Sequence, residues 1–149
     1  MSKLDDLRQQ IDKIDDQLLK LISRRGLLAQ KIGREKSVQG KHTHFHVPQR
    51  ERAIFDRLKD QNEGPFPSAS IHSIFREVFS ATLALEKPLK IAFLGPDTTF
   101  THQVAVKHFG HSCKFNPCSN IESVFSEVEL GNSDYGVVPV ENSIEGVVN

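Results

Sequence analysis

Apolar residues recur at alternating three- and four-residue steps through the first part of the chain. The positions are Leu4, Leu7, Ile11, Ile14, Leu18, Leu21, Leu28 and Ile32. This spacing predicts an amphipathic helix of about 30 residues, roughly 45 to 50 Å long, that starts at Leu4. A domain of this size cannot cover such a helix by itself, so we expect a partner helix or a second copy of the chain to pack against it.

The helical pattern continues in two further segments, residues 48–62 and 68–86. Residues 37–47 lack periodicity and predict a loop before the second helix. The proline that opens this helix suits its first turn. A break rich in glycine and proline precedes the third helix, for which Ser68 or Ser70 is the expected cap.

After the third helix, strands alternate with helices. The predicted order is a strand at 91–94, a helix at 101–109, a strand at 113–115, a helix opened by the capping box Ser119-Asn120-Ile121-Glu122 and closed by Gly131, and a strand at 135–140. This alternation is typical of a parallel α/β sheet. Two or three strands rarely close such a domain, so we expect the domain to be incomplete at Asn149.

The sequence therefore predicts two domains, an all-helical one of three helices over residues 1–87 and the first part of a parallel α/β domain over residues 88–149. Lys and Arg number 19, as do Asp and Glu, and this zero formal net charge argues against nucleic acid or an anionic membrane as a partner. The polar N-terminus is not a secretory signal, and two cysteines are too few for a disulfide scaffold. We expect a cytoplasmic protein.

Arg25 lies on the apolar stripe of the first helix, between Leu21 and Leu28. A guanidinium keeps its charge, and burying it unpaired costs several kcal/mol. No acidic residue of this helix shares the stripe, so the simplest anionic partner is a ligand. A carboxylate from another helix of a bundle is the alternative.

Other polar residues share the apolar faces of the predicted helices. They are Arg8, Lys36, Glu51, Thr82 and Glu86. Singly, each has a structural explanation, such as a solvated helix end, an ion pair of Glu51 with Arg50 or Arg52, or a hydroxyl bonded one turn back. Together with Arg25 they offer three cations, two carboxyls and a hydroxyl, which suit a compact dianion that carries a hydroxyl group.

The order and spacing of these residues resemble the all-helical chorismate mutases. The matching positions are Leu7-Arg8, Ile14-Asp15, Leu18, Leu21-Ile22-Ser23-Arg24-Arg25, Ile32-Gly33, Lys36 and Gln49-Arg50-Glu51-Arg52. The second domain resembles the start of prephenate dehydratase. Its matching positions are Ala92-Phe93-Leu94-Gly95-Pro96, Thr99-Phe100-Thr101-His102 and Val138-Pro139-Val140-Glu141-Asn142-Ser143 with Glu145-Gly146. Together they resemble the N-terminal part of the bifunctional P-protein family of phenylalanine biosynthesis.

This resemblance implies an isomerase that rearranges chorismate to prephenate, fused to a dehydratase that converts prephenate to phenylpyruvate. The mutases of the family are intertwined homodimers that use no metal or other cofactor. They hold the flexible enolpyruvyl arm over the ring and place charge where the ether oxygen becomes negative.

The resemblance also assigns roles by position. Arg25 would bind one carboxylate of chorismate, and Arg8 of the partner subunit would bind the other. Lys36 and Glu86 would contact the ether oxygen. These four residues are the predicted catalytic groups.

Further substrate contacts follow from the same resemblance. Glu51 would bind the ring hydroxyl, with Arg50 close to it, and Val47 would offer a backbone contact. Thr82 would line the pocket. Members of the family often have an acid at the position of Val47, so a side-chain contact is absent there.

The dehydratase region holds half of a site at most. Its candidate residues are Thr99, Thr101, Asn142 and Ser143. Backbone amides after Gly95 and around Asn142 suit an anion, although a plain structural turn explains them equally well. The family's Thr-Arg-Phe motif is absent, so we expect no dehydratase activity from these residues alone. Thr98 stands where the family usually has glycine.

Two hypotheses from other classes stay open. In one, the helices form a non-catalytic dimerisation module in which Arg25 pairs with a carboxylate across the interface. In the other, the α/β unit is a small-molecule sensor that binds an amino acid. His42, His44 and His46 alternate as metal ligands can, but no fourth ligand is evident, and we predict no metal site.

We predict that the mutase activity declines towards alkaline pH. Many members of the family have glutamine where Glu86 stands, and a glutamate can donate to the ether oxygen only while it is protonated. As pH rises from about 5 to about 9, kcat/KM for chorismate should therefore fall for the wild-type chain and stay flat for Glu86→Gln. Steady-state kinetics of both proteins measure this, and a wild-type profile as flat as that of the variant contradicts the prediction.

Overall fold

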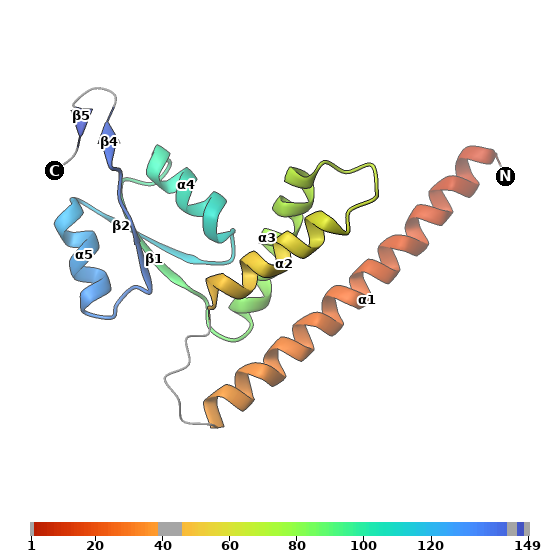
Figure 1. Cartoon of the computed structure of the whole chain (residues 1–149), viewed down its shortest axis with the longest axis horizontal. Coiled ribbons are helices and arrows are strands. Elements are labelled where there is room, and N and C mark those ends of the chain that lie inside the picture. Colours follow the sequence, from red (N-terminus) through yellow and green to blue (C-terminus); the bar gives the residue numbers. More distant parts are fainter. Residues whose placement is uncertain (1, 39–45, 143–145, 148–149) are drawn as a thin grey trace. The chain divides into compact units, whose positions relative to one another are not determined.

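The first helix, α1 (Lys3–Val38), runs without interruption in the computed structural model, which describes residues 2–38, 46–142 and 146–147 (Figure 1). Its 36 residues span about 54 Å and extend past the predicted end, because Ser37 and Val38 are helical rather than loop. Ser37 Oγ donates to the carbonyl oxygen of Gly33 at 3.0 Å.

The start of α1 is fixed by a reciprocal cap that the periodicity did not indicate. Ser2 Oγ accepts from the backbone N–H of Asp5 at 3.2 Å and donates to Asp5 Oδ2 at 2.7 Å. The same carboxylate oxygen accepts from the backbone N–H of Ser2 at 3.1 Å. The two side chains therefore satisfy backbone donors that a helix start leaves without intrahelical partners.

The apolar stripe of α1 stays accessible in one copy of the chain. Its eight residues are between 49% and 61% exposed, and they are Leu4, Leu7, Ile11, Ile14, Leu18, Leu21, Leu28 and Ile32. Such a contiguous row of exposed large apolar side chains is typical of a surface that packs against another chain.

The chain divides into two compact units, Met1–Phe45 and His46–Asn149. In the second unit α2 (Pro48–Asp60) and α3 (Ser68–Ala84) pack against each other. Phe55 of α2 is central to this contact. Its ring stacks on that of His72 at a centroid distance of 4.0 Å, and it lies 5.0 Å from the ring of the buried Phe79. All three predicted helices are confirmed.

Two expectations about α3 are wrong. Its N-cap is Pro67, which makes no side-chain cap, rather than Ser68 or Ser70. The helix ends at Ala84, so Glu86 lies in the following turn, where its backbone N–H donates to the carbonyl oxygen of Leu83 at 3.0 Å. Helix ends commonly fray, and their last residues often form a turn.

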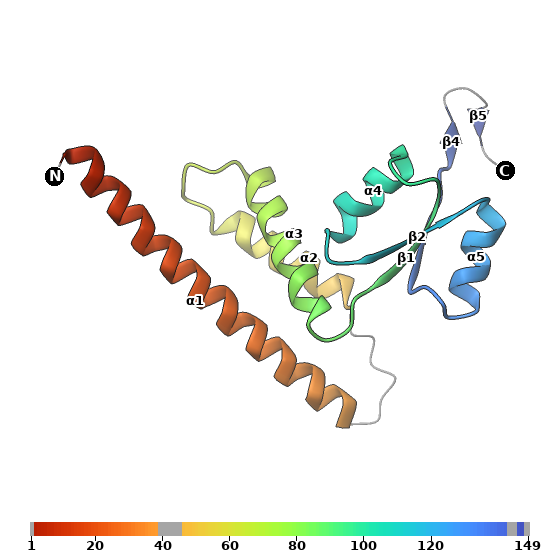
Figure 2. The ribbon, with the colours of Figure 1, turned by 180° about the vertical axis from the view of Figure 1, so that it is seen from behind.

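The α/β segment is a three-stranded parallel sheet, as predicted. Its strands are β1 (Lys90–Leu94), β2 (Lys114–Cys118) and β3 (Tyr135–Val137), in the order β2-β1-β3. The crossover helices are α4 (Phe100–Phe109) and α5 (Ile121–Glu129). Because the two crossovers run in opposite directions and each is right-handed, α4 and α5 lie on opposite faces of the sheet (Figure 2).

The central strand β1 separates two apolar clusters. On one side Ile91 packs with Ala105 and Phe109, and on the other Ala92 packs with Val124. Ile91, Ala92 and Phe93 are completely buried. A strand buried on both faces is expected for the centre of a parallel sheet and explains the continuous apolar run in the sequence.

Several local boundaries differ from the prediction. The second strand is 114–118 rather than 113–115, and β3 ends at Val137, before an antiparallel pair of two-residue strands, β4 (Glu141–Asn142) and β5 (Gly146–Val147), that was not predicted. The predicted capping box is wrong as well. Asn120 is the N-cap, and its side chain accepts from the backbone N–H of Ser123 at 2.7 Å.

The α3 helix joins the α/β segment through close polar and backbone contacts. Ser80 Oγ, which is buried, accepts from the backbone N–H of Ser112 at 3.1 Å. Glu77 accepts from both the backbone N–H and the ring of His111, at 3.1 and 2.8 Å. Gly110 has a φ of 82°, and a Cβ atom there would lie 2.4 Å from Ser80 Cβ.

In the described part of the chain, no helix is both long enough and apolar enough to span a bilayer.

We predict that Gly110→Ala destabilises the second unit more than Gly131→Ala does. Both glycines have positive φ, but a Cβ at Gly131 meets nothing within 4 Å. The Gly131 variant should therefore lose only the backbone cost of about 1 to 2 kcal/mol, whereas the Gly110 variant adds a clash with Ser80, for a total of roughly 2 to 5 kcal/mol. Urea unfolding of the two variants measures the difference. Equal losses of unfolding free energy would show that α3 does not pack this closely on the end of α4.

Candidate functional site

Glu51 lies in the first turn of α2 and is the central member of a group of four polar side chains. Its Oε2 accepts from Arg76 Nη1 at 2.6 Å, and its Oε1 lies 3.2 Å from His46 Nε2. The other ring nitrogen of His46, Nδ1, lies 2.8 Å from the hydroxyl of Tyr135. We call these four residues the Glu51 cluster. The His46, Glu51 and Arg76 side chains are only 9%, 18% and 13% exposed, so these contacts are largely shielded from water.

The carboxyl group of Glu51 is ionised in this setting. Burial alone would raise its pKa, but hydrogen bonds from His46 and Arg76 and the positive charge of Arg76 outweigh burial and hold the pKa below its usual value. The N-terminal end of α2 also favours a negative charge. Glu51 therefore offers only acceptor oxygens near neutral pH.

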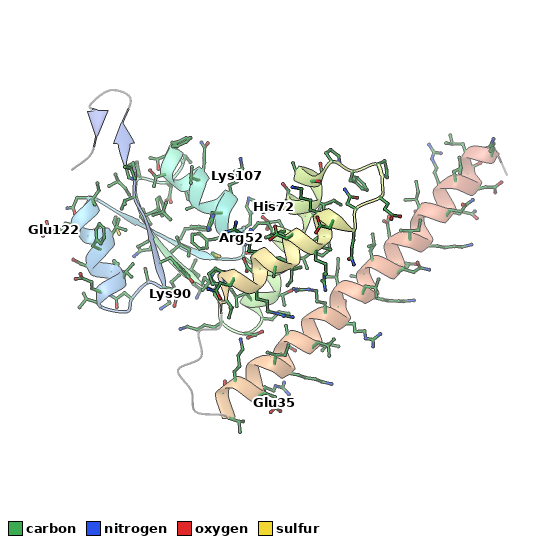
Figure 3. All side chains as sticks on the ribbon, viewed as in Figure 1. Glu35, Arg52, His72, Lys90, Lys107 and Glu122 are labelled. Atoms are coloured by element: carbon green, nitrogen blue, oxygen red, sulfur yellow. The ribbon has the colours of Figure 1, made fainter. Side chains whose placement is uncertain are left out.

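Arg76 is a site residue that the sequence did not reveal. The sequence suggested Arg50 or Arg52 as ion-pair partners of Glu51, and that expectation is wrong, because Glu51 pairs with Arg76 and His46. Arg76 instead reaches Glu51 from α3, and its guanidinium lies 4.9 Å from the centroid of the Phe55 ring. Figure 3 labels Arg52 on α2 and His72 on α3. For Arg76, the only signal in the sequence was its position three residues before the apolar Phe79.

Thr82 and Glu86 follow Arg76 along the chain. Both residues are partly buried. Thr82 Oγ1 donates to the carbonyl oxygen of Val78 at 2.5 Å, which is the structural role expected for a threonine on a helix face. Glu86 lies in the turn after α3. Val47, the N-cap of α2, is 40% exposed and makes no side-chain cap.

The cationic candidates of the first unit lie on α1. Arg25 and Lys36 are partly buried, whereas Arg8 is exposed and lies 3.7 Å from Asp5 across a surface ion pair. Arg8 and Arg25 are 17 positions apart on one continuous helix, which separates them by roughly 25 Å. Two side chains of the same helix cannot bridge that distance to bind one small molecule.

One dehydratase-like candidate, Thr99, lies at the carboxyl end of β1, where its Oγ1 donates to the carbonyl oxygen of Leu94 at 3.5 Å. Thr99 is the N-cap of α4, and its Oγ1 accepts from the backbone N–H of His102 at 3.3 Å. The ring of His102 stacks on Phe93 at 4.7 Å, and its Nδ1 accepts from the backbone N–H of Thr98 at 3.1 Å. Thr98 has a φ of 71°, which explains why glycine suits that position.

The other dehydratase candidates are less informative. Thr101 is partly buried in the first turn of α4, and Asn142 belongs to β4. Ser143 falls outside the described residues, as do His42 and His44. Within the residues that the structure describes, no three His, Cys, Asp or Glu side chains gather as metal ligands would.

Comparisons with known families divide the chain where its two patterns meet. The family model of chorismate mutase type II matches residues 7–87, and that of prephenate dehydratase matches residues 91–149. Among solved structures, the chorismate mutase (form II) of Thermus thermophilus superposes with a TM-score of 0.55 at 36% identity, covering 58% of this chain and 96% of that one.

Curated relatives extend over both regions. The bifunctional chorismate mutase/prephenate dehydratase of Aquifex aeolicus is 50% identical over all of this chain, and that of Pseudomonas aeruginosa is 44% identical over 96% of it. The chain spans 42% and 40% of the length of these two proteins. This chain therefore belongs to the chorismate mutase type II family, and its mutase region is followed by the N-terminal part of a prephenate dehydratase domain.

Proposed function

We propose that this chain rearranges chorismate to prephenate and is part of a cytoplasmic bifunctional enzyme of phenylalanine biosynthesis. The observation that carries the proposal is the match of residues 7–87 to the mutase family, with the expected charged residues present on α1, on α2 and in the turn after α3. The mutase domain would comprise residues 1–87. Residues 88–149 would begin the dehydratase domain, which in the whole protein converts prephenate to phenylpyruvate.

The charges available match those of chorismate. Its two carboxylates require cations, which Arg8 and Arg25 supply, and its ring hydroxyl requires an acceptor. The ionised Glu51 is such an acceptor. Arg50 is its neighbour in the sequence, and Thr82 would line the proposed substrate site. Charge-assisted hydrogen bonds of this kind are short and about twice as strong as neutral ones.

The rearrangement needs no nucleophile. In a single step the ether carbon–oxygen bond breaks while a carbon–carbon bond forms, and no atom is gained or lost. The residues therefore contribute by holding the reactive conformer and by stabilising the negative charge on the ether oxygen, the role proposed for Lys36 and Glu86. We propose no cofactor for this reaction.

The separation of Arg8 and Arg25 along α1 supports a homodimer. If both bind one chorismate, Arg8 must come from a second copy of the chain. The exposed apolar stripe of α1 provides the surface through which two copies would associate. A symmetric dimer would then contain two equivalent sites, each completed by Arg8 of the partner subunit.

We predict that Arg25→Ala abolishes most mutase activity, whereas Arg34→Ala does not. Removing the guanidinium leaves a substrate carboxylate without its cation, so kcat/KM should fall roughly 100- to 1000-fold. Arg34 is a matched control because it is exposed and lies about two and a half turns from Arg25, on the opposite side of the same helix. Conversion of chorismate to prephenate by the purified chain measures the effect.

Ligand binding separates this function from its alternatives. A transition-state mimic of the rearrangement should raise the melting temperature of the wild-type chain and of Arg34→Ala, but not that of Arg25→Ala. A wild-type chain that neither converts chorismate nor gains stability from the mimic would favour the dimerisation module. Stabilisation by an amino acid alone would favour the sensor.

We predict that inactive Arg8→Ala and Arg25→Ala chains restore activity when they are mixed and refolded together. A mixed dimer would contain one site with both arginines intact and one site with neither. Because random pairing makes half of the dimers mixed, activity should recover to about a quarter of the wild-type value. Chorismate turnover before and after mixing measures this, and no recovery would contradict a site shared between two copies.

A further inference from the structure

We propose that Tyr135, which belongs to the dehydratase-like region, is a positioning residue for the mutase reaction and acts through His46 on Glu51. The proposal rests on the function proposed above, in which Glu51 binds the ring hydroxyl of chorismate. Its basis is the Glu51 cluster, where a chain of contacts runs from the sheet to the first turn of α2. Tyr135 lies outside the residues matched by the mutase family model.

When the imidazole of His46 carries one proton, donor and acceptor requirements set the direction of each hydrogen bond. An ionised Glu51 can only accept, so His46 Nε2 must carry the proton that faces it. In the neutral ring Nδ1 is then an acceptor, and the hydroxyl of Tyr135 must donate to it across 2.8 Å. Burial, together with the negative charges of Asp134 and Glu51, raises the pKa of Tyr135, which keeps this hydroxyl protonated.

Packing holds Tyr135 in a defined place. In the parallel ladder it pairs with the fully buried Ile91, and its ring lies 5.2 Å from that of Phe109. The His46 ring meets Tyr135 edge-on at 5.4 Å and Phe109 at 6.4 Å. The imidazole is therefore oriented by groups of the α/β segment.

Glu51 keeps capacity for a substrate in this arrangement. Arg76 and His46 each contact one of its oxygens, and a carboxylate has about four acceptor positions. The ring hydroxyl of chorismate can therefore donate to a carboxylate whose orientation is already fixed. Losing the Tyr135 hydroxyl would leave His46 Nδ1 without its donor, allow the imidazole to reorient, and so loosen Glu51 without removing its charge.

The test compares Tyr135→Phe with the control His111→Ala. The phenylalanine variant keeps the ring that packs on Phe109 and removes only the hydroxyl. The control removes an exposed contact with Glu77 where α3 meets the turn after α4, but touches no member of the Glu51 cluster. A structural defect at this junction should therefore appear in both variants.

The first measurement is the preference for chorismate over an analogue with hydrogen in place of the ring hydroxyl. Tyr135→Phe should raise KM for chorismate and reduce this preference about three- to tenfold, while the control keeps both values. Adding His46→Ala to Tyr135→Phe should give no more loss of preference than His46→Ala alone, because the tyrosine acts through the histidine. An unchanged preference in Tyr135→Phe, or fully additive losses, would overturn the proposal.

The second measurement does not depend on activity. Nitrogen chemical shifts of His46 should show the proton on Nε2 in the wild-type chain. Tyr135→Phe should keep that proton but shift the Nδ1 resonance, because Nδ1 loses its hydrogen bond. A proton on Nδ1 in the wild-type chain would overturn the proposed action of Tyr135 on Glu51 through His46, even if the chain is an active mutase. A chain that has the expected tautomer but converts no chorismate would instead overturn the proposed function, and with it the substrate side of this proposal.

Discussion

The ion pair between Glu51 and Arg76 is the interaction on which the arrangement of α2 and α3 depends. It joins the two helices through side chains that are themselves largely shielded from water, so removing one partner would leave the other charge enclosed and uncompensated. Phe55 packs beneath the guanidinium and brings the apolar and polar parts of this contact together. The same pair keeps the carboxylate charged, which is the state required to accept a substrate hydroxyl.

The helix α3 and the residues just before α2 contact the α/β segment directly rather than through a loose linker. His46 contacts Tyr135, Ser80 contacts Ser112, and Gly110 leaves room for α3 because it has no side chain. Residues assigned to two different family models therefore share one compact unit. A change in the dehydratase-like region can reach a proposed mutase residue through these contacts alone, without a large conformational change.

The helix α1 differs from α2 and α3 because its apolar side chains have no covering partner in the described part of one copy of the chain. Its apolar residues repeat at three- and four-residue steps from Leu4 to Ile32, yet these side chains stay half exposed in one copy. Hydrophobic surface of this extent gains free energy when it is covered. The positively charged Arg25 and Lys36 interrupt an otherwise apolar face, which is consistent with a binding site built where two such faces meet.

The sequence by itself determined the helices, the central strand and the family, because helix periodicity and the alternation of elements are local and are repeated over many residues. It also pointed to Glu51 as a polar residue on an apolar face. Only the tertiary structure decided the partners of Glu51, since Arg76 lies 25 positions away, and brought His46 to Tyr135 across 89 positions. Ion pairs and tautomers depend on which side chains meet in space, and that is settled by packing between elements rather than by the pattern within any one of them.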